Sequence, residues 1–185
     1  MTLGEGKKKV YELLDEYSAG GTVETDEDIE LKMADFFDMA QKDVAKYKRI
    51  VKTKKINREA GRTEYSMPAD MEKLYRVWVD GRVRNNRYDF RAGRIIIPMM
   101  DPSEEIIIEY FAIPETISAE TEDSYEFELP DDACNLLPYF VAAQQLLPDL
   151  VMDYQAPWMI YQNMLAQLDK SLPGQNTGLR QSFYR

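Results

Sequence analysis

The pattern of apolar residues between positions 25 and 51 constrains the fold most strongly. Apolar side chains recur there every three or four residues, which places them on one side of an α-helix for about six turns. They are Ile29, Met33, Phe36, Phe37, Ala40, Val44, Tyr47 and Val51. Thr25 and Asp28 have the [ST]-x-x-[DE] spacing of a helix start. The sequence therefore predicts a long amphipathic helix that buries one face against the rest of the chain.

A shorter helix is predicted before this one and two more near the end of the chain. Residues 7–17 carry apolar side chains at helical spacing and are followed by the breaker SAGGT. Residues 129–147 begin with Leu-Pro-Asp-Asp, a favourable helix start, because proline is tolerated in the first turn and carboxylates are stabilised there. The last helix runs from about residue 151 to residue 168, bent or restarted at Pro157.

Pro138 lies inside the predicted helix 129–147. Proline has no backbone N–H to donate, and its ring crowds the carbonyl four residues earlier, which here belongs to Cys134. An unbroken straight helix is therefore not expected, and the sequence predicts a bend near residues 134–137.

The sequence between about residues 60 and 128 has a different texture. It is rich in β-branched and aromatic residues, with Gly and Pro between the apolar runs. Residues 73–82, 94–100 and 104–114 have the character of strands. Their connections are too short for the crossovers that parallel strands need, so we expect an antiparallel sheet of about four strands.

The predicted fold class is α+β, with a helical core and an inserted antiparallel β-sheet region. The core would consist of the short N-terminal helix, the long helix and the two C-terminal helices. Residues 7–55 and 129–170 would form the helical part, residues from about 60 to 128 the β insertion, and residues 171–185 a flexible C-terminal tail. A chain of 185 residues, 44% of them hydrophobic, most simply forms a single domain, residues 1–185.

Most of the common catalytic and metal-binding arrangements require residues that this chain lacks. It has no histidine, and its one cysteine, Cys134, cannot form an internal disulfide. Neither a phosphate-binding G-x-x-x-x-G-K-[ST] loop nor a G-x-G-x-x-G motif occurs. Asp131 and Asp132 flank the expected helix start, so Cys134 is predicted to be a buried, inert thiol. We expect no catalytic residues, no metal site and no cofactor.

Acidic residues occur in pairs or clusters at Glu104-Glu105, Asp131-Asp132 and residues 26–30. Glycosidase or metal chemistry would need two carboxylates held across a cleft, which adjacency in sequence does not supply. Helix starts and a solvated strand edge account for these groups more simply. An enzyme with a carboxylate-centred site is the weakest of three functional hypotheses.

Membrane association is not expected. No stretch approaches the roughly 20 apolar residues that span a bilayer, and the first residues contain no apolar signal core. The sequence therefore predicts a protein that stays in the compartment where it is made.

Charge is distributed in blocks along the chain. The net charge is −7 over residues 1–45, +9 over 46–94, −15 over 95–169 and +3 over 170–185. Such blocks suit association with a complementary surface, including a second copy in a head-to-tail ring. The alternative is that blocks distant in sequence interleave in space and cancel.

A basic stretch covers residues 46–62. Its positive side chains are Lys46, Lys48, Arg49, Lys52, Lys54, Lys55, Arg58 and Arg62. Together with the arginines up to Arg94, they could contact nucleic-acid phosphates or form a subunit-contacting face, with Tyr47, Tyr75 and Tyr88 available for base stacking. A nucleic-acid-binding module using residues 46–94 is therefore the second hypothesis, although the net charge of −10 opposes attraction to DNA.

The order of segments resembles the head-to-tail connector proteins (portal adaptor or neck proteins) of tailed bacteriophages and prophages. The stretches that carry the resemblance are TDEDIELKMADFFDMAQKDVAKY, MPADMEKLYRVWVDG, ELPDDACNLLPYFVAAQQLLPD and YQNMLAQLDK. They span roughly residues 7–170 and are packing patterns. The β insertion departs from the smaller, nearly all-helical members, so another neck component, such as a stopper or tail-completion protein, is an alternative.

The resemblance implies a structural virion protein that assembles in the host cytoplasm and acts in the virion neck. It implies a ring of about a dozen copies, through which DNA passes and in transient contact with it. The implied partners are other copies of the chain, the portal protein and a tail or stopper protein. This is the first functional hypothesis.

Members of this family are often anchored on the portal through an extended terminal segment. The matching residues here are Leu179, Arg180, Phe183, Tyr184 and Arg185. The aromatic pair could act as an anchor beside the two arginines. We therefore predict a portal or subunit contact at these residues, with a frayed end as the alternative.

Overall fold

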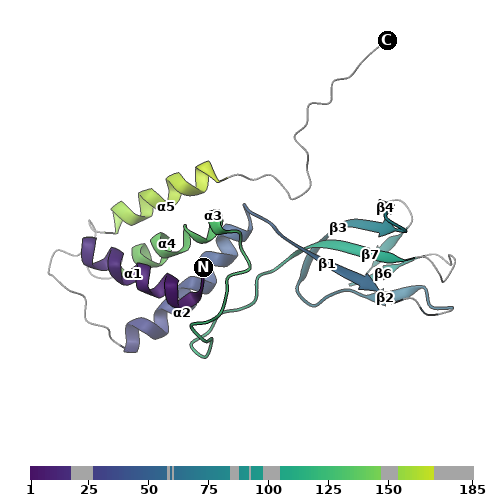
Figure 1. The fold of residues 1–185 in the computed structure, drawn as a ribbon, viewed down its shortest axis with the longest axis horizontal. Coiled ribbons are helices and arrows are strands. Elements are labelled where there is room, and N and C mark those ends of the chain that lie inside the picture. The colour runs from purple at the N-terminus through teal and green to yellow at the C-terminus, as the bar shows by residue number, and fades with distance from the viewer. Residues whose placement is uncertain are drawn as a thin grey trace, which may run out of the picture.

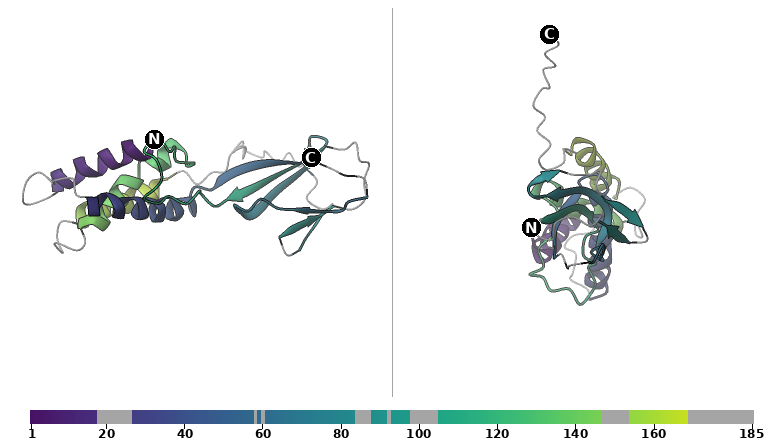
Figure 2. Two further views of the ribbon diagram at one scale, coloured as in Figure 1. Left: turned by 90° about the horizontal axis from the view of Figure 1, so that it is seen from below. Right: turned by 90° about the vertical axis from the view of Figure 1, so that its right-hand side faces the viewer.

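The computed structural model of the protein describes residues 1–17, 27–57, 59, 61–83, 88–91, 93–97, 105–146 and 154–168. The body is elongated, with the helices at one end and the strands at the other (Figure 1). We call these the helical part and the strand part. A second view shows that they meet through a narrower middle, which the chain crosses on entering β1 and after leaving β7 (Figure 2).

The helical part is built around its central helix, α4. Its elements are α1 (Leu3–Tyr17), α2 (Glu27–Ala45), α3 (Asp131–Cys134), α4 (Leu137–Leu146) and α5 (Gln155–Gln167). Helix α4 packs against α1, α2 and α5. The buried side chains of α2 include Met33, Phe37, Ala40 and Val44, which confirms the predicted apolar stripe over this part of the helix. The N-terminal and C-terminal helices therefore share one core.

Helix α1 begins four residues before the predicted start, at Leu3. The reason is a capping box. The Glu5 backbone N–H donates to Thr2 Oγ1 at 3.2 Å, and the Thr2 N–H donates to Glu5 Oε2 at 2.8 Å. This reciprocal pair satisfies donors that the first turn would otherwise leave unpaired.

The predicted continuation of the long helix to Val51, and of the helical part to residue 55, is wrong. Helix α2 ends at Ala45, and residues 50–56 form strand β1. Ile50, Val51 and Ile56 are β-branched residues that favour strands. Pairing with β7 over the whole length of β1 then decides the conformation.

The region around Pro138 contains a break between two helices. Helix α3 ends at Cys134, and α4 starts at Leu137, so Pro138 lies in the first turn of a new helix. A missing N–H costs little at that position, since first-turn donors have no partner within the helix. The interruption lies where the sequence predicts a bend.

The strand part contains two antiparallel sheets, where the sequence predicts one sheet of four strands. The first sheet has the order β1 (Ile50–Ile56), β7 (Ile106–Ala112), β3 (Met71–Val79) and β4 (Arg82–Val83). The second has the order β2 (Glu64–Ser66), β6 (Arg94–Ile96) and β5 (Asp89–Arg91). The predicted tight turn at Asp80-Gly81 joins β3 to β4, with φ positive at both residues.

The predicted organisation, a helical core that carries an inserted sheet, is also wrong. Both sheets bury β-branched residues, including Ile95, Ile106, Ile108 and Val77, and the buried cluster runs through strands as well as helices. The strand part is a substantial body at its own end of the molecule (Figure 1). Buried and half-buried residues alternate along β7, and the buried residues of both sheets belong to the same cluster as those of the helices, so the helices alone are not the core.

Residues 113–130 return the chain from β7 to the helical part. Thr2 and Glu126 form an isolated antiparallel bridge, and the Leu3 N–H donates to the Tyr125 carbonyl at 2.8 Å. Phe127 packs its ring on that of Phe37 in α2. This returning segment is thus fixed to α1 and α2 before it enters α3.

Candidate interaction surfaces

The structure divides the basic stretch among three kinds of local structure. Lys46, Lys48 and Arg49 follow α2, Lys52, Lys54 and Lys55 lie on β1, and Arg62 precedes β2. Arg58 lies outside the described residues. Because side chains of a strand alternate between the two faces of a sheet, the stretch does not form one continuous basic face.

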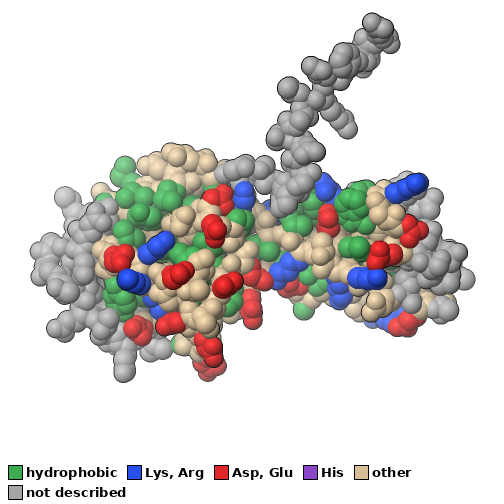
Figure 3. Space-filling view, in the orientation of Figure 1, with side chains coloured by type: hydrophobic (Ala, Val, Ile, Leu, Met, Phe, Trp, Pro, Cys, Tyr) green, Lys and Arg blue, Asp and Glu red, His purple; other side chains and the backbone are tan. Residues whose placement is uncertain are grey.

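Most of these basic side chains pair with carboxylates of the same chain. The pairs are Lys46–Asp43, Lys48–Asp132, Arg49–Glu72, Lys52–Asp70, Lys52–Glu128, Lys55–Glu105 and Arg62–Glu59. Within the described residues of the stretch, Lys54 has no such partner. Acidic and basic side chains lie next to one another over the middle and the strand part (Figure 3). Four of these seven pairs join the basic stretch to carboxylates of the two acidic blocks, so the blocks interleave in space around it.

This pairing leads to a prediction for nucleic-acid binding. We expect a labelled DNA duplex to show no binding at about 50 mM salt, because most positive side chains described in residues 46–62 are already paired with carboxylates. The measurement is a fluorescence-anisotropy titration at several salt concentrations. Binding that weakens steeply as salt rises would instead support the nucleic-acid-binding hypothesis.

A cluster of four polar side chains and one backbone N–H, that of Glu115, occupies the region where the two parts meet. We call it the joint cluster: Lys52, Asp70, Tyr110, Glu115 and Glu128. Lys52 Nζ, on β1, lies 3.0 Å from Asp70 Oδ2 and also pairs with Glu128. The Tyr110 hydroxyl donates to Asp70 Oδ1 at 3.2 Å, and the Glu115 N–H donates to Glu128 Oε2 at 3.1 Å. One amino group thus connects β1, the turn before β3 and the returning segment.

The ion pairs of the joint cluster shift the protonation equilibria of its members. Burial opposes the charged form of Lys52, but the hydrogen bonds that its ammonium donates to Glu128 and Asp70, together with their charges, outweigh burial and raise the pKa of Lys52. Burial likewise opposes ionisation of Asp70, but the hydrogen bond and charge of Lys52 lower the pKa of that carboxyl. Both groups are therefore charged at neutral pH, as a structural ion pair requires.

Helix α2 also contacts the returning segment. Gln41 is fully buried, and its Nε2 donates to the Glu115 carbonyl at 2.6 Å. The Ile117 N–H donates to Asp38 Oδ1 at 3.1 Å. Residues 115–128 are therefore attached both to the strand part and to the helical part. An open hollow of about 490 Å³ lies beside Lys52, Asp70 and Glu128.

The carboxylate pairs do not converge on a common point within the described residues. Asp131 and Asp132 are exposed. Asp131 Oδ1 lies 3.9 Å from the Met1 amino group, and Asp132 Oδ2 lies 3.7 Å from Lys48 Nζ. Glu105 pairs with Lys55, and Glu104 lies outside the described residues. No group of three or more metal-ligating side chains occurs in the described part of the chain. The described residues therefore provide no site that would support the hypothesis of a carboxylate-centred enzyme.

Cys134 is buried at the end of α3. Its Sγ donates to the Leu129 carbonyl at 3.1 Å, and only 1% of the residue is exposed. Burial raises the pKa of the thiol to about 11. The position has the properties of an inert packing cysteine.

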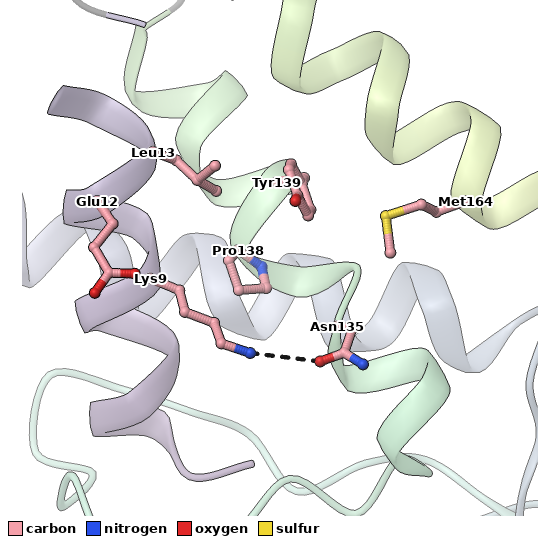
Figure 4. A pocket seen from close by; sticks show the side chains of 7 residues that line it. All are labelled: Lys9, Glu12, Leu13, Asn135, Pro138, Tyr139 and Met164. Carbon is pink, nitrogen blue, oxygen red and sulfur yellow. Dashed lines mark hydrogen bonds between the residues drawn. The ribbon is translucent and has the colours of Figure 1, made fainter. Parts of the chain in front are cut away.

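A groove opens on the helical part between α1, the α3–α4 turn and α5. It holds about 480 Å³ and is lined by Lys9, Glu12, Leu13, Asn135, Pro138, Tyr139 and Met164. The Tyr139 and Met164 side chains face each other across the gap between α4 and α5, with Leu13 and Pro138 beside them (Figure 4). The groove thus has an apolar floor formed by three helices that are distant in sequence.

The rim of the groove is polar. Lys9 Nζ donates to Asn135 Oδ1 at 3.5 Å, across the space between α1 and the α3–α4 turn (Figure 4). A second hollow of about 410 Å³ shares Lys9, Glu12 and Asn135 and extends the groove towards Asp131. Apolar floor and charged rim together suit a short peptide that carries both apolar and charged side chains.

The predicted contact residues Leu179, Arg180, Phe183, Tyr184 and Arg185 lie outside the described residues, so that contact stays a prediction. The groove and the joint cluster were not predicted from the sequence. Pro138 stood out in the sequence only as a helix interruption. The break that this proline accompanies turns α3 away from α4 and contributes to the groove.

No described helix combines the length and apolar content that crossing a membrane requires. A scan against protein-family models finds no match to the chain, and a search of curated proteins finds none either.

Proposed function

We propose that this chain is a structural virion protein of a tailed phage or prophage, a head-to-tail connector that forms a ring between the portal and the tail. The observation that supports it best is the elongated body with unlike ends, helical at one and stranded at the other (Figure 1). A head-to-tail ring needs two different, complementary surfaces on every copy. Such a body offers unlike surfaces along its length, helical at one end and stranded at the other (Figure 1).

The edges of the first sheet are a second supporting feature. Strand β1 is at one edge, and at the other edge β4 pairs only with Trp78 and Val79 of β3. Within the described strands, residues 71–77 of β3 therefore have a partner on one side only. Lys52, Lys54 and Lys55 on β1 are typical of an edge that resists uncontrolled aggregation. The two open edges differ, as a contact between unlike surfaces requires.

Exposed apolar side chains occur on both parts. Met39 is 52% exposed on α2 and Met159 is 63% exposed on α5, while Val83, Phe90 and Ile113 are exposed on or next to strands. Single exposed apolar residues are common on protein surfaces. Here they add to the proposal because methionine and aromatic residues are enriched at the centre of protein interfaces.

Oligomeric state tests the proposal directly. We expect purified protein to form rings, or to remain monomeric and form rings only on a portal, when measured by mass photometry and negative-stain electron microscopy over a range of concentrations. Binding should also be measured against portal and tail proteins, where the genes beside its own encode such proteins. A monomer that binds none of them would overturn the proposal.

The same experiment separates the connector from other neck components. An adaptor is expected to bind the portal directly, whereas a stopper or tail-completion protein is expected to bind only after the adaptor is present. The order of addition in a pull-down on immobilised portal therefore distinguishes these roles.

A further inference from the structure

The groove on the helical part is open to solvent and lies between α1, α4 and α5. Its floor is formed by Leu13, Pro138, Tyr139 and Met164. Among the described residues, the Glu12 carboxylate at its rim has no ion pair or hydrogen bond. An apolar floor beside an unpaired carboxylate favours a ligand that presents apolar side chains next to a positive charge.

The last residues of the chain have this chemistry. Leu179, Phe183 and Tyr184 are apolar or aromatic, and Arg180 and Arg185 flank them. The sequence 170–185 contains no Asp or Glu and has a net charge of +3. The hollows that form the groove are lined by the carboxylates of Glu5, Glu12 and Asp131, by the lysines Lys8 and Lys9 and by Met1 with its amino group, so their charges sum to zero. The positive charge of the segment therefore finds its complement locally, at the unpaired Glu12 carboxylate.

We propose that the groove binds residues 179–185 of this same protein. Phe183 and Tyr184 insert between Tyr139 and Met164, where aromatic rings and a thioether make favourable contacts. An arginine of the segment then lies beside Glu12, where a guanidinium can bind a carboxylate through two parallel hydrogen bonds.

The length of the chain allows this docking. The described chain ends at Leu168, one helical turn, or about 6 Å, beyond Met164 of the groove. The residues between Leu168 and Leu179 can span about 35–40 Å when extended. The segment can therefore reach the groove of its own copy or of an adjacent copy, and the inference does not require a ring.

Disulfide trapping tests the proposal on the full chain. Met164→Cys is combined with Tyr184→Cys, and the protein is oxidised mildly at neutral pH. Cys134 does not compete, because it is buried and its thiol is protonated at that pH. We expect a 164–184 disulfide in most of the protein, measured by non-reducing gels and by mass spectrometry of peptides.

The matched control is Asn163→Cys combined with Tyr184→Cys. Asn163 is exposed on the same helix but does not line the groove. We expect at least tenfold less disulfide at this position.

Competition and charge reversal provide two further checks. A synthetic peptide of residues 179–185 should reduce disulfide trapping at position 164 only. Glu12→Lys is also expected to reduce trapping at position 164 severalfold.

Equal trapping at positions 163 and 164, or trapping unaffected by the peptide, would overturn the inference. A disulfide within one chain or between two chains supports it in either case and identifies the copy that supplies the segment. Trapping in a protein that never forms rings would support this docking while counting against the connector function. The two proposals therefore fail on different results.

Discussion

Phe37→Ala is expected to lower the free energy of unfolding by about 3–5 kcal/mol, the range for removing a large buried aromatic side chain. Phe37 is fully buried in α2, and its ring packs on Phe127 at a centroid distance of 5.6 Å. A Cβ atom on Gly6 of α1 would lie 3.0 Å from the Phe37 ring, so this contact is tight. The substitution leaves a cavity where α1, α2 and the returning segment meet.

Urea unfolding followed by circular dichroism measures this loss. The matched control is Phe36→Ala, since Phe36 neighbours it on the same helix and is only partly buried. We expect the control to lose less than half as much stability. A loss below about 1 kcal/mol for Phe37→Ala would mean that the ring does not hold the three segments together.

Alkaline pH is expected to produce the second large effect, a fall in the free energy of unfolding as pH rises from about 9 to 12. Burial raises the pKa of Cys134 from 9.0 to about 11 and the pKa of Tyr125 from 10.0 to about 12. Burial and the hydrogen bond to Asp43 also raise the pKa of Tyr161. The neutral forms of all three groups are therefore favoured in the folded protein.

The direction of this pH dependence follows from comparing the pKa values of these groups in the folded and unfolded states. When the folded pKa lies above the unfolded one, the stabilisation is complete below the unfolded pKa and is lost as pH rises through the folded pKa. For Cys134 the lost contribution is on the order of 2–3 kcal/mol between pH 9 and 11. Unfolding curves at successive pH values measure it.

Cys134→Ala provides the control for this pH dependence. The variant has no thiol to ionise, so its stability is expected to be lower at pH 7 but to fall less steeply between pH 9 and 11. An equally steep fall in the variant would show that Cys134 is not responsible for that part of the curve.

The helices that sequence predicts well are those whose signal is local. The stripe from Met33 to Val44 is buried in α2 as its spacing requires. The same period continues to Val51 in the sequence, but Ile50 and Val51 pair with Ala112 and Phe111 of β7. Helical spacing and strand propensity conflict there, and a partner about 60 residues away decides between them. A local sequence pattern does not identify that partner strand.

The joint cluster and the groove depend on contacts between segments that are distant in sequence. Lys52 and Glu128 form an ion pair although strands β2 to β7 separate them in sequence. The sequence does not identify such partners, so the basic stretch was interpreted as a charged surface. Leu13, Tyr139 and Met164 come from three helices whose packing sets the shape of the groove. Sequence could supply the chemical types of these residues but not their proximity.

The order of elements also has a consequence for how the chain acquires its structure. Helix α4 packs against α1 and α2, yet the strand part separates them in sequence. On the ribosome, α1 and α2 emerge with their apolar faces uncovered, and they stay so until residues 137–146 have been synthesised. Closing a loop of this length delays the final collapse of the helical part, since non-local contacts form late. The last third of the chain, which contains α4, therefore protects α1 and α2 in the first third from aggregation.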